Sequence, residues 1–217
     1  MNIQDIYNLN KKNFLYSQYS DVENDRNNVL NNFSINKFDK KNNESLRNTD
    51  LKKFFEFDYK YNHQENQSIT RINKDGSYSI VSVNGKCENY DDEQIQIHNL
   101  SELDSKDYFN NELLNTDDFF IDLNSLLLNS GFKIKIKKNK NVKIKISNLI
   151  SEKNFTVFQR NYILCEEGSS VELIDEYEDK NDAINNVYKI LQIEKNANFN
   201  HTIVQENSFN HSLILST

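Results

Sequence analysis

The chain has 217 residues, a net charge of −7 and a mean hydropathy of −0.80. The acidic balance argues against a nucleic-acid or anionic-membrane partner. The N-terminus lacks the apolar stretch of a secretory signal, and no segment approaches the roughly 18 apolar residues of a membrane span. Cys87 and Cys165 are too far apart for a disulfide framework or a metal knuckle, so we expect a protein of the reducing cytoplasm.

Residues 1–66 are expected to form an N-terminal α-helical region. Apolar residues recur at helical spacing through its first part, for example at Ile3, Ile6 and Tyr7 and again at Val29 and Leu30. Further along, Thr49 or Asp50 is a plausible N-cap for a short helix over the segment LKKFF, residues 51–55.

Residues 67–131 are expected to be a mixed entry segment of strands and one helix. Three short strands, at 68–72, 77–83 and 94–98, are bounded by the turn signals Asp75-Gly76 and Asn84-Gly85. A helix should follow, capped by Thr116 and ended by Gly131 as its C′ residue. Its apolar face would carry Phe119, Phe120, Leu123, Leu126 and Leu127.

After Gly131 the chain reads as strands with an internal repeat. Three segments align without gaps, each with a charged residue, a turn-former, a small or polar pair and then an alternating strand. The first strand residue of each is Val142, Val171 and Phe199, so the steps are 29 and 28 residues. Because the chain has four glycines and no proline, asparagine must supply most of its turns.

A period near 28 residues suits one coil of a parallel β-solenoid. We therefore predict a mainly β fold, with a parallel β-solenoid over residues 132–217 preceded by the helical region. One inward column would contain Val142, Val171 and Phe199, and the next would contain Ile144, Leu173 and His201. A further column supports the same period, because Tyr162 and Ile190 also lie 28 residues apart. The alternative is a meander of antiparallel strands.

Several of these segments resemble the SufB/SufD family of iron–sulfur cluster assembly proteins, and most closely the N-terminal half of SufD. SLRNTDLKKF, residues 45–54, is similar to the Trp-Arg-x-Thr-Asp-Leu signature of that family, with Leu46 in place of the tryptophan and Asn48 in place of an aromatic residue. VNGKC, residues 83–87, resembles the family's short strand that ends in Asn-Gly. Residues 162–179 and 185–212 resemble the start of its core domain, without the family's proline-containing strand entry.

The resemblance implies that the solenoid is a right-handed parallel β-helix. It also implies that the protein is part of the SUF complex. Such proteins pair with a SufB-like subunit as a heterodimer and dock a SufC-like ABC ATPase, and the complex carries an iron–sulfur cluster transiently. The resemblance also implies that the chain stops inside the solenoid at Thr217, so that the β-helix core is truncated. The half of the family fold that holds the proposed cluster ligands would then lie beyond this chain, and no cofactor is expected on it.

Three residues are candidate metal ligands, but each has a more ordinary interpretation. Cys165 ends a strand beside Glu166 and Glu167, whose charges would raise the pKa of its thiol, and a lone strand cysteine is usually packed as a small apolar residue. His201 and His211 lie ten residues apart, and His201 falls in an apolar column, where a hydrogen-bonded core histidine is expected.

Two other features are conceivable chemical sites. Cys87 follows a turn and has no partner near it in the sequence. The acidic run over residues 175–179 could pair carboxylates for glycoside chemistry, but we interpret it as a solvated loop between coils.

The sequence contains no Walker A, GxSxG or HExxH motif, so it offers no independent nucleophile, phosphate-binding loop or zinc site. The resemblance implies a non-enzymatic scaffold that acts by protein–protein association. One alternative is a carbohydrate-binding or adhesive β-solenoid, which should carry an export signal and an aromatic stripe or carboxylate cluster on one face. The other is a generic repeat binding module.

Overall fold

A computed structural model describes residues 3–32, 60, 68–104, 118–151, 153–179, 183–207 and 213–216 of the chain. The fold is mainly β with short N-terminal helices, as the sequence predicted. No helix in these ranges is long and apolar enough to cross a membrane. The division into segments 1–66, 67–131 and 132–217 stays a prediction.

The N-terminal region contains the helices α1 (Ile3–Asn10) and α2 (Ser20–Asn32), with a 3-10 turn, η1 (Lys11–Asn13), between them. Ile6 and Tyr7 are buried, as expected from the helical spacing. Asp21 and Glu23 lie in the first turn of α2, where negative charge complements the helix dipole. The predicted helix at residues 51–55 lies outside the described residues.

The helix α5 (Phe119–Leu127) forms where the sequence predicted a helix, but both of its ends differ from the prediction. Its N-cap is Asp118, whose Oδ1 accepts hydrogen bonds from the backbone N–H groups of Phe120 (2.7 Å) and Ile121 (3.1 Å). Thr116, the predicted cap, lies outside the described residues. All five predicted apolar residues of the helix are buried.

Gly131 is not the C′ residue of α5, so that prediction was wrong. The helix ends at Leu127, and Gly131 already lies in strand β5 (Ser130–Ile136) with a φ of +142°. A Cβ atom at this position would meet the backbone oxygen of Arg160 at 2.1 Å. The glycine is therefore required by close contact between neighbouring strands.

The entry segment is antiparallel. Strands β1 (Ile69–Ile72) and β2 (Tyr78–Val83) form a hairpin, and Gly76 in its turn has a φ of +80°. Strands β3 (Tyr90–Asp91) and β4 (Ile95–Asn99) follow, then the turn η4 (Leu100–Glu102), and β4 pairs antiparallel with β5. At the second predicted turn, Asn84 and Gly85 both have positive φ.

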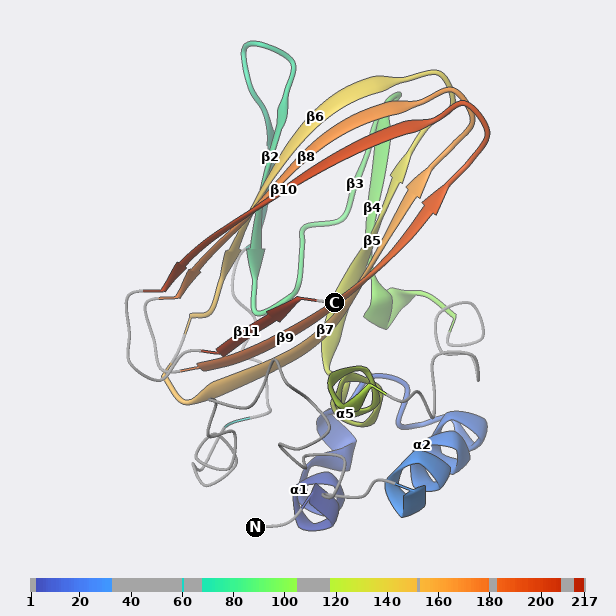
Figure 1. Cartoon of the computed structure of the whole chain (residues 1–217), viewed down its shortest axis with the longest axis vertical. Coiled ribbons are helices and arrows are strands. Elements are labelled where there is room, and N and C mark those ends of the chain that lie inside the picture. Colours follow the sequence, from blue (N-terminus) through green and yellow to red (C-terminus); the bar gives the residue numbers. More distant parts are fainter. Residues whose placement is uncertain are drawn as a thin grey trace.

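From β5 onward the strands alternate between two sheets. They are β5, β6 (Asn141–Leu149), β7 (Phe155–Cys165), β8 (Ser170–Asp179), β9 (Ala183–Ile193), β10 (Asn198–Asn207) and β11 (Leu213–Ser216). The six-stranded sheet has the order β11-β9-β7-β5-β4-β3, and the five-stranded sheet has the order β1-β2-β6-β8-β10. Figure 1 shows the two sheets joined at one end by the turns that follow β5, β7 and β9, with the helices gathered towards the other end.

We define three repeat units, β5–β6, β7–β8 and β9–β10, which pair strand for strand in parallel. In the five-stranded sheet Val142, Val171 and Phe199 are register partners, and so are Ile144, Leu173 and His201. Tyr162 pairs with Ile190 in the six-stranded sheet. The predicted columns are confirmed, and an antiparallel meander is excluded for these strands.

The turn that joins the two strands of each unit also stacks on the corresponding turn of the next unit. Asn139, Gly168 and Asn196 occupy the same place in the repeat, and their φ values are 58°, 71° and 59°. Backbone bonds of 3.1 Å join the turns, from Asn139 N to Glu167 O and from Gly168 N to Lys195 O. The expectation that asparagine would supply left-handed turns is confirmed at Asn139 and Asn196, while glycine occupies the same place in the second unit.

Ion pairs cross between the first and second units on the outside of the sheets. Lys143 pairs with Glu172 (3.0 Å), and Lys145 pairs with Glu176 (2.8 Å). Near the turns, Lys135 pairs with Glu166 and Lys138 with Glu167, both at 2.6 Å. In each pair the first unit supplies the lysine and the second unit the glutamate.

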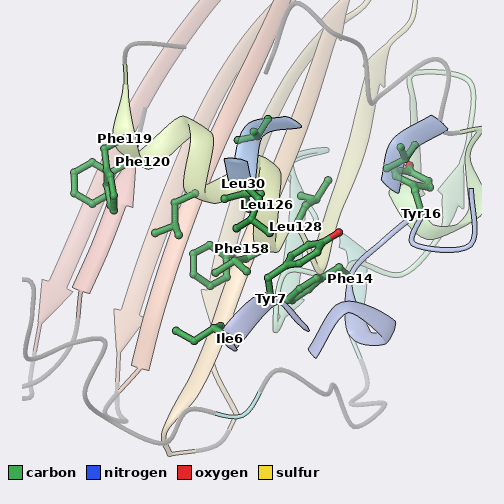
Figure 2. Packing of buried hydrophobic residues seen from close by; sticks show 14 of the residues in the cluster. Ile6, Tyr7, Phe14, Tyr16, Leu30, Phe119, Phe120, Leu126, Leu128 and Phe158 are labelled. Atoms are coloured by element: carbon green, nitrogen blue, oxygen red, sulfur yellow. The ribbon is translucent and has the colours of Figure 1, made fainter. Parts of the chain in front are cut away.

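The helices pack against the outer face of the six-stranded sheet. Side chains from α1, α2 and α5 form one apolar cluster with Phe158 of β7 and Ile184 of β9. Figure 2 shows Tyr7, Phe14, Leu126 and Leu128 gathered around Phe158 in this cluster. The cluster fixes the N-terminal helices to the first halves of β7 and β9.

Candidate functional site

A band of polar side chains crosses the interior between the two sheets. On one side of it lies the larger apolar cluster, which includes Ile146 of β6 and Ile163 of β7. On the other side lies a small cluster that includes Ile150 and Val157. Along β6 and β7 the alternating inward positions between these clusters are polar. The band comprises Ser82, Asn148, Gln159, Asn161, Asp175, Tyr177, Asn185 and Lys189.

Asp175 is the centre of this band. Its side chain is 1% exposed, and its Oδ2 lies 3.2 Å from Lys189 Nζ and 2.6 Å from His201 Nε2. Lys189 Nζ also donates a hydrogen bond of 2.7 Å to the Tyr177 hydroxyl and lies 5.1 Å from the centre of that ring. Three strands, β8, β9 and β10, therefore bring a carboxylate, an ammonium group and an imidazole together at one point.

The charges of this cluster change the acidity of its members. Burial raises the pKa of Asp175, but the His201 hydrogen bond and the Lys189 charge outweigh burial and hold this pKa below its usual value. Burial, together with the Asp175 charge, raises the pKa of Tyr177 well above its usual value. The cluster consequently holds an ionised carboxylate beside a neutral phenol.

The acidic run was wrongly interpreted as a solvated loop. Residues 175–179 belong to strand β8, in which alternate side chains enter the interior, so Asp175 and Tyr177 are buried while Glu176 pairs with Lys145 outside. The strand forms by parallel pairing with β6 and β10, and Asp175 is accommodated inside because Lys189 and His201 of later strands contact it. The acidic residues of the run are consequently divided between the interior, where Asp175 lies, and the outer face of the sheet, where Glu176 and Glu178 lie.

The two candidate histidines have different outcomes. His201 has a side chain 20% exposed and is hydrogen-bonded to Asp175, as expected for a histidine at an inward position. His211 lies outside the described residues. In the described part of the chain no three His, Cys, Asp or Glu side chains are grouped as metal ligands would be.

Cys165 is fully buried at the end of β7, and burial raises the pKa of its thiol to about 11. The predicted direction of this shift is correct, but the predicted cause is not, because Glu166 turns to Lys135 and Glu167 to Lys138. Cys87 is 3% exposed, and burial likewise raises the pKa of its thiol, with a further contribution from the charge of Asp175.

Both thiols are therefore expected to resist modification in the folded protein. With 5,5′-dithiobis(2-nitrobenzoate) at pH 8, we expect native Cys87 and Cys165 to react on the order of 100-fold more slowly than in the urea-unfolded chain, since only thiolates react and both groups must first be exposed. The absorbance of the released thionitrobenzoate measures both rates. A native thiol that reacts at the unfolded rate would contradict the packing described for it.

A second buried polar network attaches α5 to the six-stranded sheet. Asn124 Nδ2 donates to Gln159 O (3.0 Å) and to Asn186 Oδ1 (3.0 Å), and Asn186 Nδ2 donates to Phe120 O (3.0 Å). The fully buried Arg160 donates from Nη2 to Ser125 Oγ at 2.8 Å. These residues were missed in the sequence, because each looks like an ordinary polar residue of a helix or a strand.

The geometry defines a mainly β protein with a parallel two-sheet body, an N-terminal helical region and a buried ionic cluster. Residues 1–84 match the family model described as the SufBD protein N-terminal region. This match places the N-terminal part of the chain in the SufB/SufD family, as the resemblance predicted, and a region of this kind indicates a role in SUF iron–sulfur cluster assembly. Searches of curated proteins and of solved structures gave no match.

Proposed function

We propose that this chain is a SufD-like scaffold subunit of the SUF iron–sulfur cluster assembly complex. It would have no catalytic activity of its own and would act in the reducing cytoplasm by association with a SufB-like subunit and a SufC-like ATPase. The family match over residues 1–84 is the observation that carries the proposal. The parallel pairing of β5 to β11 in two sheets supports it, because the resemblance implies a β-helical core.

The proposal includes a right-handed parallel β-helix as the architecture of the repeat units. Successive strands alternate between the two sheets, and strands one unit apart pair in parallel, as the turns of a β-helix do. Connections between parallel neighbours of one sheet are right-handed in about 98% of proteins, because of the right-handed twist of strands. This preference supports the right-handed form.

SufD is favoured over SufB for two reasons found in the sequence. The N-terminal helical region leads directly into the signature-like segment at residues 45–54, and no cysteine-rich ligand motif occurs in the chain. The described residues also fit an iron–sulfur cluster poorly, since Cys87 and Cys165 are buried thiols of raised pKa. In this proposal the iron–sulfur cluster is the cargo of the complex, and neither cysteine is one of its ligands.

Co-purification tests the proposal. The affinity-tagged chain is co-expressed with the SufB homologue and the SufC homologue of the same genome, and the eluate is analysed by size-exclusion chromatography and mass spectrometry. We expect one complex containing all three chains. Co-expression with each partner alone is the control, and it identifies which contact this chain supplies. Elution of the chain without either partner, while the two partners still bind each other, would contradict the proposed role.

A further inference from the structure

The turn after β2 contains the one Asn-Gly sequence of the chain, Asn84-Gly85. Such a sequence is especially prone to deamidation in a peptide, because glycine has no side chain to hinder attack of its backbone nitrogen on the asparagine side chain. The two residues have φ values of 52° and 75°, and two backbone bonds of 3.0 Å between Val83 and Lys86 close the turn. Whether the sequence reacts in the folded protein depends on how its surroundings restrain it.

The side chain of Asn84 is held by Ser151, which follows β6. Asn84 Nδ2 donates to Ser151 Oγ (3.0 Å), and Ser151 N donates to Asn84 Oδ1 (3.1 Å). We call these two bonds the Asn84–Ser151 clasp. The backbone of Asn84 is fixed as well, since its N–H donates to Leu149 O at 2.9 Å. Asn84 is 2% exposed, and a Cβ atom on Gly85 would collide with Ser130, so neither residue of the turn has room to rotate.

We propose that Asn84 is a deamidation site that the clasp keeps unreactive, so that the reaction marks chains in which this turn has opened. In the reaction the Gly85 nitrogen, after losing its proton to a base, attacks Cγ of Asn84. The bond from Cγ to Nδ2 breaks, ammonia leaves, and a cyclic succinimide forms. Water then opens the ring at either of its carbonyl carbons and leaves aspartate or isoaspartate at position 84.

Isoaspartate prevents the turn from closing again. It adds a methylene group to the backbone before Gly85, at a point that is already packed against Ser130 and Val157. Beyond the turn the chain crosses from the five-stranded sheet to the six-stranded sheet. There the N–H of Cys87 donates to Asn99 Oδ1 (3.0 Å), and Asn99 Nδ2 donates to Cys87 O (2.6 Å). A displaced turn therefore disturbs the connection between the two sheets.

Peptide mapping of the 217-residue chain tests the proposal, because trypsin releases residues 75–86 as one peptide in which Asn84 is the one amide side chain. The folded chain and the guanidinium-unfolded chain are incubated at pH 8, and mass spectrometry follows the deamidated fraction of this peptide. We expect the folded chain to react on the order of 100-fold more slowly, because the turn must open first. Equal rates in the two states would overturn the proposal, and so would an unfolded chain in which Asn84 stays intact.

Ser151→Ala isolates the clasp, because it removes the acceptor of Asn84 Nδ2 and leaves the backbone N–H of residue 151 in place. Deamidation of the folded chain should become about two- to tenfold faster, as expected for the loss of one hydrogen bond. Ser101→Ala is the matched control, since Ser101 is an exposed serine of η4, and it should react at the wild-type rate. Equal deamidation rates in the two variants would show that the clasp gives no protection, which overturns the proposal.

Refolding of a partly deamidated sample tests the effect of isoaspartate. Aspartyl and isoaspartyl forms of the peptide separate by reversed-phase chromatography. We expect the isoaspartyl form to be depleted about tenfold or more in the compact fraction from size-exclusion chromatography, relative to the aggregated fraction. Asn84→Asp carries the new charge without the added methylene group, and it should refold more completely than the isoaspartyl chain. Equal amounts of the isoaspartyl form in both fractions would overturn this part of the proposal.

Discussion

Replacing Gly131 with alanine is expected to lower the free energy of unfolding by about 3 kcal/mol or more, because the substitution combines overpacking with backbone strain. The added Cβ would lie 2.1 Å from Arg160 O and 2.9 Å from Leu100 Cδ1, and the φ of +142° is one that L-residues rarely adopt. The backbone of β7 cannot move away without disturbing its pairing with both β5 and β9. Urea unfolding followed by circular dichroism measures the change.

Gly76→Ala is the matched control for this prediction. Gly76 also has a positive φ, of +80°, but no atom beyond its chain neighbours would lie within 4 Å of the added Cβ. Its substitution should therefore cost only the conformational term, about 1–2 kcal/mol. Equal losses for the two variants would show that the contact with Arg160 is unimportant. If Gly131→Ala yields no soluble protein while Gly76→Ala does, the direction of the prediction is upheld.

Replacing Lys189 with methionine is expected to lower the free energy of unfolding by about 3 kcal/mol, because it leaves Asp175 with one charged partner fewer in the interior. Methionine keeps most of the volume of the lysine stem, so the loss reports mainly on the charge. The side chains of Lys189 and Asp175 are 7% and 1% exposed, and water cannot take over the role of the ammonium group. Urea unfolding at pH 7 measures the loss.

Lys143→Met is the control, since Lys143 makes a similar pair with Glu172 at 3.0 Å but on the surface, with side chains 71% and 50% exposed. It should change stability by about 0–1 kcal/mol. The loss in Lys189→Met should also shrink as the pH falls below the usual range of an aspartic acid, because protonation of Asp175 removes the unpaired charge. Adding Asp175→Asn should restore part of the loss at pH 7. If the loss of stability in Lys189→Met changes neither with pH nor with the added Asp175→Asn, its cause would be altered packing and not the unpaired charge.

The alignment of the repeat units could be predicted from the sequence because two local signals agree. Left-handed turns need asparagine or glycine, and Asn139, Gly168 and Asn196 mark the same point in each unit. The alternating strand that follows each turn then fixes which residues point inward. These signals lie within a few residues of one another, so the columns at Val142 and Ile144 could be predicted without knowing the fold.

The buried cluster could not be predicted in this way. Asp175 lies among acidic residues and has the composition of a surface segment, while its partners Lys189 and His201 lie 14 and 26 positions away. Their proximity follows from the pairing of three units, and no local pattern encodes it. The prediction for Gly131 failed for a related reason. The glycine lies only four residues after the end of α5, which suggested a helix C-terminus, whereas the strand that requires a glycine there, β7, comes later in the chain.

The ion pairs between the first two units also limit how such a chain could grow by gene duplication. A second copy of the first unit, inserted next to the original, would set Lys143 against Lys143 on the outer face, where like charges directly opposite are destabilising. A second copy of the second unit would set Glu172 against Glu172 outside and Asp175 against Asp175 inside. The repeat units share their backbone fold and their turns, but the charges of their side chains suit each unit to only one place in the stack.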